Sequence, residues 1–416
     1  MLEQFRERIL GRQPLCLRGG GSKDFYGQAL AGELLDTRGY AGIVEYQPSE
    51  LVVTARCGTP LAGLQSLLAA RGQMLACEPP GFNGAATVGG VIAAGLSGPR
   101  RANAGAVRDF LLGVRLLDGE GRLLRFGGQV MKNVAGYDVA RLMAGSLGTL
   151  GLIVEASLKV LPLPAAEATL RLDLPQAAAI EQMNRWAGRP LPLSATCWHD
   201  GVLSVRLSGA TAAVAAAEAM IGGERIDAAA AAGFWDSLRE QRHAFFAPLI
   251  DATPLWRLSV PSTAAPLALP GPVLLEWGGA QRWWYGRAGR DATERDAAAA
   301  ARAAALPRVA TQRCFAAAPR PRARIAACSS RSHRQSCASI ANSSAPSIRA
   351  ACSTPAACTP GCRWRRISPH SCVTHLPVAR PRRSCVAACI VASARRPARP
   401  TSSPAMSSMD RAAASI

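Results

Sequence analysis

Three glycine-rich runs are the parts of this chain whose residue types could bind a ligand. They are residues 18–22, 86–95 and 144–151. Glycine adopts positive φ and lets a backbone approach a ligand closely, and consecutive exposed N–H groups form concave anion-binding nests. Three such runs favour one large, phosphate-bearing cofactor that is contacted at several points. Three tight turns, for which the glycines alone would suffice, are the alternative.

The segments between these runs must hold them in place. Strands are predicted from apolar patterns at residues 15–17, 43–46, 51–56 and 152–160, with a hairpin at 114–117 and 123–126. The strand at 152–160 alternates apolar and polar residues, so it is expected to be half-buried. Thr59 and Pro60 are expected to begin a helix as N-cap and first residue, and Gly72 to end it. Pro162 and Pro164 mark a domain boundary.

Residues 165–305 are expected to form a second domain of mixed strands and helices. Its strands are predicted at residues 169–172, 195–199, 202–207, 255–260 and 273–277, and its helices at 176–186 and 212–221. Trp283, Trp284 and Tyr285 follow the last strand. They are expected to lie in the core or an interface, and a cofactor pocket is the alternative. The predicted fold class is therefore α+β.

The charge of the chain is concentrated in its last quarter. The net charge is +20, yet residues 307–416 contain 18 Arg, no Lys and one acidic residue, Asp410. A charge this high would by itself suggest nucleic acid or an anionic membrane as a partner. Because the first 306 residues are nearly neutral, they are typical of an ordinary globular protein, and no nucleic acid is expected as their partner.

Residues 306–416 form a low-complexity segment of Arg, Ala, Ser, Pro and Cys that holds nine of the 13 Cys. Its few large apolar residues cannot offset the entropy of ordering, so it is expected to be disordered. A frameshifted reading that begins near residue 305 is our interpretation, and a basic tail that binds nucleic acid or membrane is an alternative. No metal site is predicted, because the spacing suits zinc poorly at Cys358, Cys362, His370, Cys372 and His375.

Several motifs resemble the FAD-binding domain of the vanillyl-alcohol-oxidase-like flavoproteins, the PCMH-type family. They are residues 17–23, 132–138, 145–151, 256–261 and 276–280. The resemblance is closer to the accessory FAD-binding subunits of bacterial glycolate oxidases. It implies a PCMH-type FAD-binding domain over residues 1–164, followed by the smaller α+β domain over 165–305. A Rossmann fold is disfavoured because its fingerprint spacing is absent.

The resemblance implies roles for individual residues toward FAD. The pyrophosphate would be cradled by the backbone N–H groups of Gly19, Gly20, Gly21 and Ser22. The flavin and ribityl path would be lined by Pro80, Gly81, Thr87, Gly89, Gly90 and Gly95. The adenosine half would be held, or the pocket closed, by Gly148, Thr149, Gly151 and Ile153. Relatives with covalent FAD often carry His where this chain has Ser22, so non-covalent FAD is expected.

Catalytic residues are not assigned from the sequence. Oxidation of a 2-hydroxy acid needs a base for the hydroxyl proton and a cation for the carboxylate. His199 and His243 are the only His before the tail. They form no clustered pair in the sequence, unlike the His that hold a metal in the catalytic relatives. Arg18 and Lys132 could equally pair with phosphate or form surface salt bridges.

The resemblance implies an FAD-dependent oxidoreductase that acts on the CH–OH group of 2-hydroxy acids as one subunit of a complex. Its partners would be a catalytic flavoprotein subunit and an iron–sulfur subunit, which together oxidise glycolate to glyoxylate. One alternative is a self-sufficient FAD-dependent 2-hydroxy-acid dehydrogenase, and the other is a nucleic-acid-binding protein that acts through its tail. The chain start lacks a signal-peptide core, so a cytoplasmic location is expected, with peripheral association at the inner face of the membrane left open.

Overall fold

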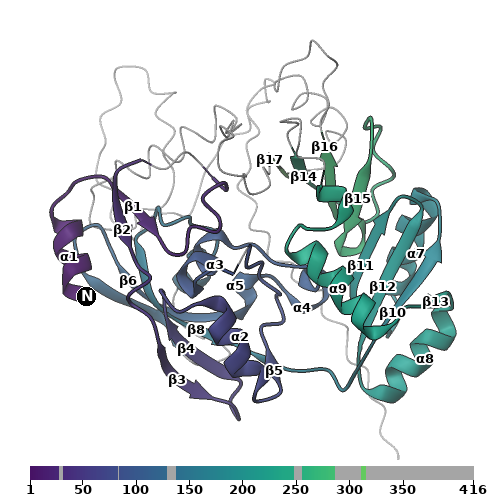
Figure 1. Ribbon diagram of the computed structural model, residues 1–416, viewed down its shortest axis with the longest axis horizontal. Coiled ribbons are helices and arrows are strands. Elements are labelled where there is room, and N and C mark those ends of the chain that lie inside the picture. The colour runs from purple at the N-terminus through teal and green to yellow at the C-terminus, as the bar shows by residue number, and fades with distance from the viewer. Residues whose placement is uncertain (28–30, 83, 129–136, 248–254, 286–310, 315–416) are drawn as a thin grey trace, which may run out of the picture. The chain divides into compact units, whose positions relative to one another are not determined.

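Two large antiparallel sheets organise the described part of the chain (Figure 1). The computed structural model describes residues 1–27, 31–82, 84–128, 137–247, 255–285 and 311–314. All of them lie in Met1–Pro346, the first of two units. The mixture of two sheets with packed helices confirms the predicted α+β class. None of the described helices is long and apolar enough to cross a membrane.

The first sheet has five strands in the order β3-β4-β8-β6-β7, and every neighbouring pair is antiparallel. Their bounds are Ile43–Gln47 (β3), Val52–Arg56 (β4), Leu111–Leu117 (β6), Leu123–Gly127 (β7) and Leu152–Lys159 (β8). Four helices share a core with this sheet: α2 (Leu61–Ala69), α3 (Val88–Ala94), α5 (Val107–Phe110) and α6 (Val139–Leu142). α4 (Arg101–Ala104) lies between α3 and α5 in the chain, and the short strands β5 (Gln73–Met74) and β9 (Leu161–Pro162) pair beside α2.

A second layer covers the other side of β8. It consists of α1 (Leu2–Leu10) and the parallel pair β1 (Leu15–Arg18) and β2 (Glu33–Asp36). Its apolar cluster contains Phe5, Leu35, Leu117, Leu152 and Val154. β8 is therefore buried on both faces, whereas its alternating sequence predicts a half-buried strand.

One polar residue of this alternating pattern is buried. The carboxylate of Glu155 is buried and accepts hydrogen bonds from Tyr40 and Arg115, each at 3.0 Å. These partners satisfy a charge that the sequence alone assigns to solvent, because a buried carboxylate needs hydrogen bonds or a counter-ion.

The second sheet has eight strands in the order β13-β10-β12-β11-β15-β16-β14-β17. Their bounds are Ala166–Asp173 (β10), Leu193–His199 (β11), Val202–Gly209 (β12), Glu224–Arg225 (β13), Leu255–Ser259 (β14), Val273–Glu276 (β15), Gln281–Tyr285 (β16) and Thr311–Cys314 (β17). Successive side chains of a strand point to opposite faces. Accordingly, Leu275 packs with α7 (Gln176–Ala187) and α8 (Thr211–Ile221), whereas Leu274 packs with α9 (Ala228–Arg239) and the 3-10 turn η1 (Ala244–Phe246).

The beginning of α2 differs from the prediction. The helix begins at Leu61 with Pro60 at the N-cap position and no side-chain cap. The hydroxyl of Thr59 instead forms hydrogen bonds with the backbone of Gly42, which precedes β3. It accepts from the N–H of Gly42 at 3.0 Å and donates to the carbonyl of Gly42 at 3.1 Å. The predicted cap was wrong because the threonine hydroxyl has a tertiary partner.

Strand β17 lies within the segment for which the sequence predicts disorder. Residues 311–314 pair antiparallel with β14 at the edge of the second sheet. The predicted boundary at residue 305 therefore precedes a strand that belongs to this sheet. The rest of residues 306–416, including the zinc-like Cys and His spacing, lies outside the described residues.

Candidate functional site

The first glycine run packs on the segment that leads into α3. A Cβ on Gly19 would overlap the hydroxyl of Thr87, and a Cβ on Gly20 would overlap the carbonyl oxygen of Ala85. The two runs can approach this closely only because these positions lack side chains. Glycine here is therefore required by contact between protein loops.

The third glycine run is bonded to the other end of α3. The carbonyl groups of Ile92 and Ala93, in the last turn, accept hydrogen bonds from the N–H groups of Gly145 and Leu147, each at 2.9 Å. These bonds satisfy carbonyls that have no partner within the helix. The structure thus gathers the three runs, which are far apart in the sequence, around one short helix.

The second run is largely helical rather than a loop. Thr87 caps α3, and its hydroxyl accepts a hydrogen bond from the N–H of Gly90 at 3.3 Å. Gly95 ends the helix in a left-handed conformation with φ of 63°, as glycine commonly does at this position. A Cβ on Gly89 would lie 2.7 Å from the Cβ of Cys57. This glycine therefore lets α3 pack closely against the residue that follows β4.

Gly90 provides the clearest test of whether a cofactor fits here. Glycine inside a helix costs about 1 kcal/mol relative to alanine. Among the described residues outside the backbone of α3, the one atom within 4 Å of a Cβ on Gly90 is the hydroxyl oxygen of Thr87, and its distance of 3.3 Å is already a tight contact. A cofactor that lies against the backbone of α3 would also require glycine here, so the contact of Gly90 with FAD stays a prediction.

The loop at residues 80–82 is held by an acidic residue that follows α9. The carboxylate of Glu240 accepts hydrogen bonds from the N–H groups of Gly81 at 3.0 Å and Phe82 at 2.6 Å, and from Arg239 at 2.9 Å. Burial raises the pKa of Glu240, but these donors outweigh it, so the pKa lies below its usual value. A cavity of about 270 Å³ adjoins the loop and is lined by Leu61, Gly81, Gly84, Ala86, Arg239 and Glu240, among others. Pro80 is buried beside it.

Two of the residues assigned to the adenosine half lie in packing positions. Ile153 is 4% exposed in the core of the first sheet. A Cβ on Gly151 would lie 2.6 Å from the carbonyl oxygen of Leu117, and its φ is 135°. The packing of β8 on β6 is a sufficient reason for both residue types, so their contact with FAD stays a prediction.

The other members of that group lie in the turn before β8. The hydroxyl of Thr149 donates to the carbonyl of Ser146 at 2.7 Å, and Gly148 has φ of 76° with Leu17 of β1 3.2 Å from where its Cβ would be. This turn therefore rests on the strand that leads into the first glycine run.

Arg18 forms a salt bridge. Its guanidinium lies 2.6 Å from the carboxylate of Asp24 and folds over Gly21, which has φ of 72°. Ser22 follows at a half-buried position. Of the two roles left open for Arg18, the structure shows the ion pair. Lys132 lies outside the described residues.

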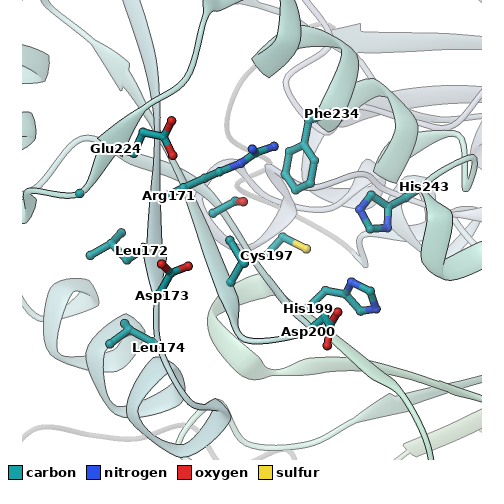
Figure 2. A pocket seen from close by; sticks show the side chains of 13 residues that line it. Arg171, Leu172, Asp173, Leu174, Cys197, His199, Asp200, Glu224, Phe234 and His243 are labelled. Carbon is teal, nitrogen blue, oxygen red and sulfur yellow. The ribbon is translucent and has the colours of Figure 1, made fainter.

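His199 and His243 lie together, which corrects the expectation of no clustered pair. Their ring centroids are 5.4 Å apart with planes at 87°, because η1 brings residue 243 back to the end of β11. Burial lowers the pKa of both imidazoles. Figure 2 shows the two rings near one another at a cavity of about 740 Å³, whose lining includes Cys197, Asp200 and Phe234. Among the residues that the structure describes, no group of three or more His, Cys, Asp or Glu is placed to hold a metal ion.

Glu276 is a buried acid that sequence reasoning gave no role. It is 4% exposed at the end of β15, and its Oε2 accepts hydrogen bonds from Trp283 at 2.7 Å and Gln281 at 2.9 Å. Burial raises the pKa of Glu276 to about 7. The side chain lines a cavity of about 20 Å³ with Pro80 and Arg257, which is room for about one water molecule. The sequence signal for this residue is weak, since one Glu at a strand end usually faces solvent.

Comparison with known proteins decides the family. Residues 10–127 match the family described as FAD binding domain. Glycolate oxidase subunit GlcE of Escherichia coli strain K12 is 48% identical over 283 residues, which are 68% of this chain and 79% of that protein. The chain belongs to the GlcE family. FAD is the cofactor of this family's first domain, as the sequence motifs predict.

More distant relatives match a smaller share of this chain. Glycolate oxidase subunit GlcD of Bacillus subtilis strain 168 is 31% identical over 161 residues, 38% of this chain and 34% of that protein. A D-2-hydroxyglutarate dehydrogenase of Xanthomonas citri pv. viticola is 33% identical over 142 residues, 34% and 29% of the two chains. A solved alkyldihydroxyacetonephosphate synthase aligns with a TM-score of 0.49 at 18% identity, over 62% of this chain and 56% of its own. GlcE proteins are thus related to FAD-linked oxidoreductases of 2-hydroxy acids, and GlcD and GlcE are both subunits of a multi-subunit glycolate oxidase.

Proposed function

We propose that this chain is the FAD-binding subunit of a glycolate oxidase complex and takes part in the oxidation of glycolate to glyoxylate. The observation that carries the proposal is 48% identity to a glycolate oxidase subunit over 79% of its length. The gathering of three glycine runs around α3 supports it, because these runs are the parts assigned to the cofactor. Bound flavin supplies the capacity to accept two electrons from a substrate and pass them onward.

The protein would hold FAD without a covalent bond. The backbone N–H groups of residues 19–22 would bind the diphosphate, since exposed N–H groups of such loops form anion nests. The flavin and ribityl path would follow residues 80–81 and α3, which Thr87, Gly89, Gly90 and Gly95 shape. The adenosine half would lie against the turn before β8, near Gly148 and Thr149. Ser22 stands where covalent relatives often carry His.

Two acidic residues would act beside the cofactor in different ways. Glu240 would orient residues 80–82, because its carboxylate holds two backbone N–H groups of that loop. Glu276 could take up or release a proton near neutral pH, since burial raises its pKa to about 7 and a group of that pKa suits acid–base work.

The partners would be a catalytic flavoprotein subunit and an iron–sulfur subunit of the same complex. The sequence relation to GlcD, the second kind of glycolate oxidase subunit, supports a flavoprotein partner. The location would be cytoplasmic, with peripheral contact to the inner face of the membrane through the complex.

The test is co-expression of the full chain with the two partner subunits, followed by purification through a tag on this chain. We expect all three to co-purify and glycolate oxidation to require all three. Acid precipitation should leave the flavin in the supernatant, as expected for non-covalent FAD. Full turnover of glycolate by this chain alone would overturn the accessory role and favour a self-sufficient dehydrogenase.

A further inference from the structure

Lys23 has an unusual position in a chain that contains few lysines. The sequence has 48 Lys and Arg residues, of which only Lys23, Lys132 and Lys159 are lysines. Lys23 directly follows the first glycine run. Its Nζ lies 3.3 Å from the hydroxyl of Ser22 and 5.4 Å from the ring centroid of Phe82. The half-buried side chain therefore lies between the first glycine run and the loop that contains Phe82.

The acidic groups near Lys23 already have partners. Asp24 pairs with Arg18 at 2.6 Å. Glu240 accepts two backbone N–H groups of the neighbouring loop and pairs with Arg239 at 2.9 Å. Within the described ranges, no carboxylate forms an ion pair with the ammonium of Lys23. Among these described charged groups, the ammonium of Lys23 is therefore the one cation that has no ion-pair partner.

This cation is costly without a ligand. Burial lowers the pKa of Lys23 to about 8, although the carboxylate of Glu240 acts in the opposite direction. An ammonium group that leaves water without an ion-pair partner loses hydration free energy, and the attraction of Glu240 offsets only part of that loss. An anion that binds beside Ser22 would offset the rest, because charge-assisted hydrogen bonds to phosphate are strong.

We propose that the ammonium of Lys23 pairs with the diphosphate of bound FAD, next to the N–H groups of the first glycine run. The inference rests on the proposed placement of the diphosphate at residues 19–22. Pairing with phosphate stabilises the charged lysine, so FAD binding takes up a proton above about pH 8. FAD affinity is then highest below that pH and declines as the pH rises.

The first experiment compares FAD with ADP, which carries the diphosphate without the flavin. Dissociation constants are measured on the FAD-free full chain for wild type, Lys23→Met, Lys23→Arg and the control Lys159→Met. We expect Lys23→Met to weaken both ligands by about tenfold to a hundredfold. Lys23→Arg should keep most of the affinity and lose its pH dependence, since arginine stays charged, and Lys159→Met should match wild type.

The outcomes separate this inference from the proposed function. Unchanged FAD affinity in Lys23→Met would overturn the inference alone. Weaker FAD with unchanged ADP would also overturn it, because the lysine would then act at the flavin. Failure of the wild-type chain to bind FAD would overturn the proposed function and the inference with it.

A second measurement follows the lysine itself and does not depend on a variant that binds poorly. Reductive methylation with ¹³C-formaldehyde labels the three lysines and the amino terminus, and Lys23→Arg identifies the signal of residue 23. The pKa of this group should be about 8 in the free chain and should rise by roughly one unit or more when ADP saturates the site. A pKa that does not move with ADP would contradict the pairing.

Discussion

The carboxylate of Glu240 and the backbone N–H of Gly81 are joined by a hydrogen bond of 3.0 Å. Glu240 directly follows α9, which packs on the second sheet, whereas Gly81 belongs to the loop that leads to α3. The bond therefore fixes a loop assigned to the flavin by means of a residue about 160 positions later in the chain. Such a contact cannot be read from local sequence.

Glu240→Gln should destabilise the protein by about 1–3 kcal/mol at pH 7, because a charged acceptor of buried N–H groups is replaced by a neutral one. The folded-state pKa of Glu240 is below its unfolded value. Its stabilisation is therefore present above the unfolded pKa and is lost as the pH falls through the folded one. Urea unfolding at pH 7 and at low pH should show the difference shrink. The control is Glu181→Gln, whose side chain is 72% exposed beside Arg185 and which should cost little.

Gly20→Ala should lower both stability and flavin content, because its Cβ would overlap the carbonyl oxygen of Ala85. We expect a loss of more than about 2 kcal/mol, since backbone cannot move aside cheaply. The matched control is Gly63→Ala inside α2, where no atom of the described residues outside the helix backbone lies within 4 Å of the new Cβ. That variant should gain about 0.5–1 kcal/mol from helix propensity. Thermal unfolding and the ratio of flavin to protein absorbance measure both effects, and equal behaviour of the two variants would contradict the packing argument.

Arg206→Met should cost about 3–5 kcal/mol, because it removes the buried guanidinium and leaves Glu78, whose side chain is 16% exposed, with one cation fewer. Glu78 lies 2.9 Å from Arg206 of β12 and 3.0 Å from Arg100. Burial raises the pKa of Glu78, and the two guanidinium groups lower it by more. The double variant Glu78→Gln with Arg206→Met should therefore cost less than the sum of the single variants. Strict additivity in urea unfolding would show that the pair is not coupled.

His243→Asn should make stability less dependent on pH as the pH falls below about 6.5, the usual pKa of histidine. Burial holds the pKa of His199 and His243 below the unfolded value, while Asp200 acts in the opposite direction on His199. Their contribution is thus present above the unfolded pKa and is lost as the pH falls through the folded one. Asn retains a side-chain acceptor for the N–H of Phe245, which His243 now binds at 3.2 Å. A variant with the same pH slope as wild type would show that residue 243 does not titrate in this range.

Strands were the most predictable part of this fold. Apolar alternation located β10 and β12, because their apolar side chains share one face that packs on α7 and α8. β11 and β14 were also predicted, although each has apolar residues on both faces of the sheet. α3 was read as a glycine loop, since Gly89 and Gly90 argue against a helix until the close approach to Cys57 is known. α9 was not predicted. It begins with a run of five alanines, and an alanine run has no alternation of apolar and polar residues that would indicate a buried helix face.

The candidate site was predictable only where its residues form a motif within one continuous segment of the sequence. The three glycine runs could be found, and so could the family, because their motifs are local. The pairing of His199 with His243 and the bond between Glu240 and Gly81 depend on how the second sheet folds back. Ile153 was assigned to the cofactor from the family resemblance; its side chain lies in the core, and its contact with FAD stays a prediction.

The glycine runs hold one another through protein atoms, as Gly20 does with Ala85 and Gly145 with Ile92. The cradle is thus preorganised by folding, and little conformational freedom is left for a ligand to remove when it binds. A cofactor that binds to a preorganised site can dissociate and bind again while the chain stays folded. The FAD of this subunit should accordingly exchange with free FAD. The supply of FAD can then limit activity independently of how much protein the cell makes.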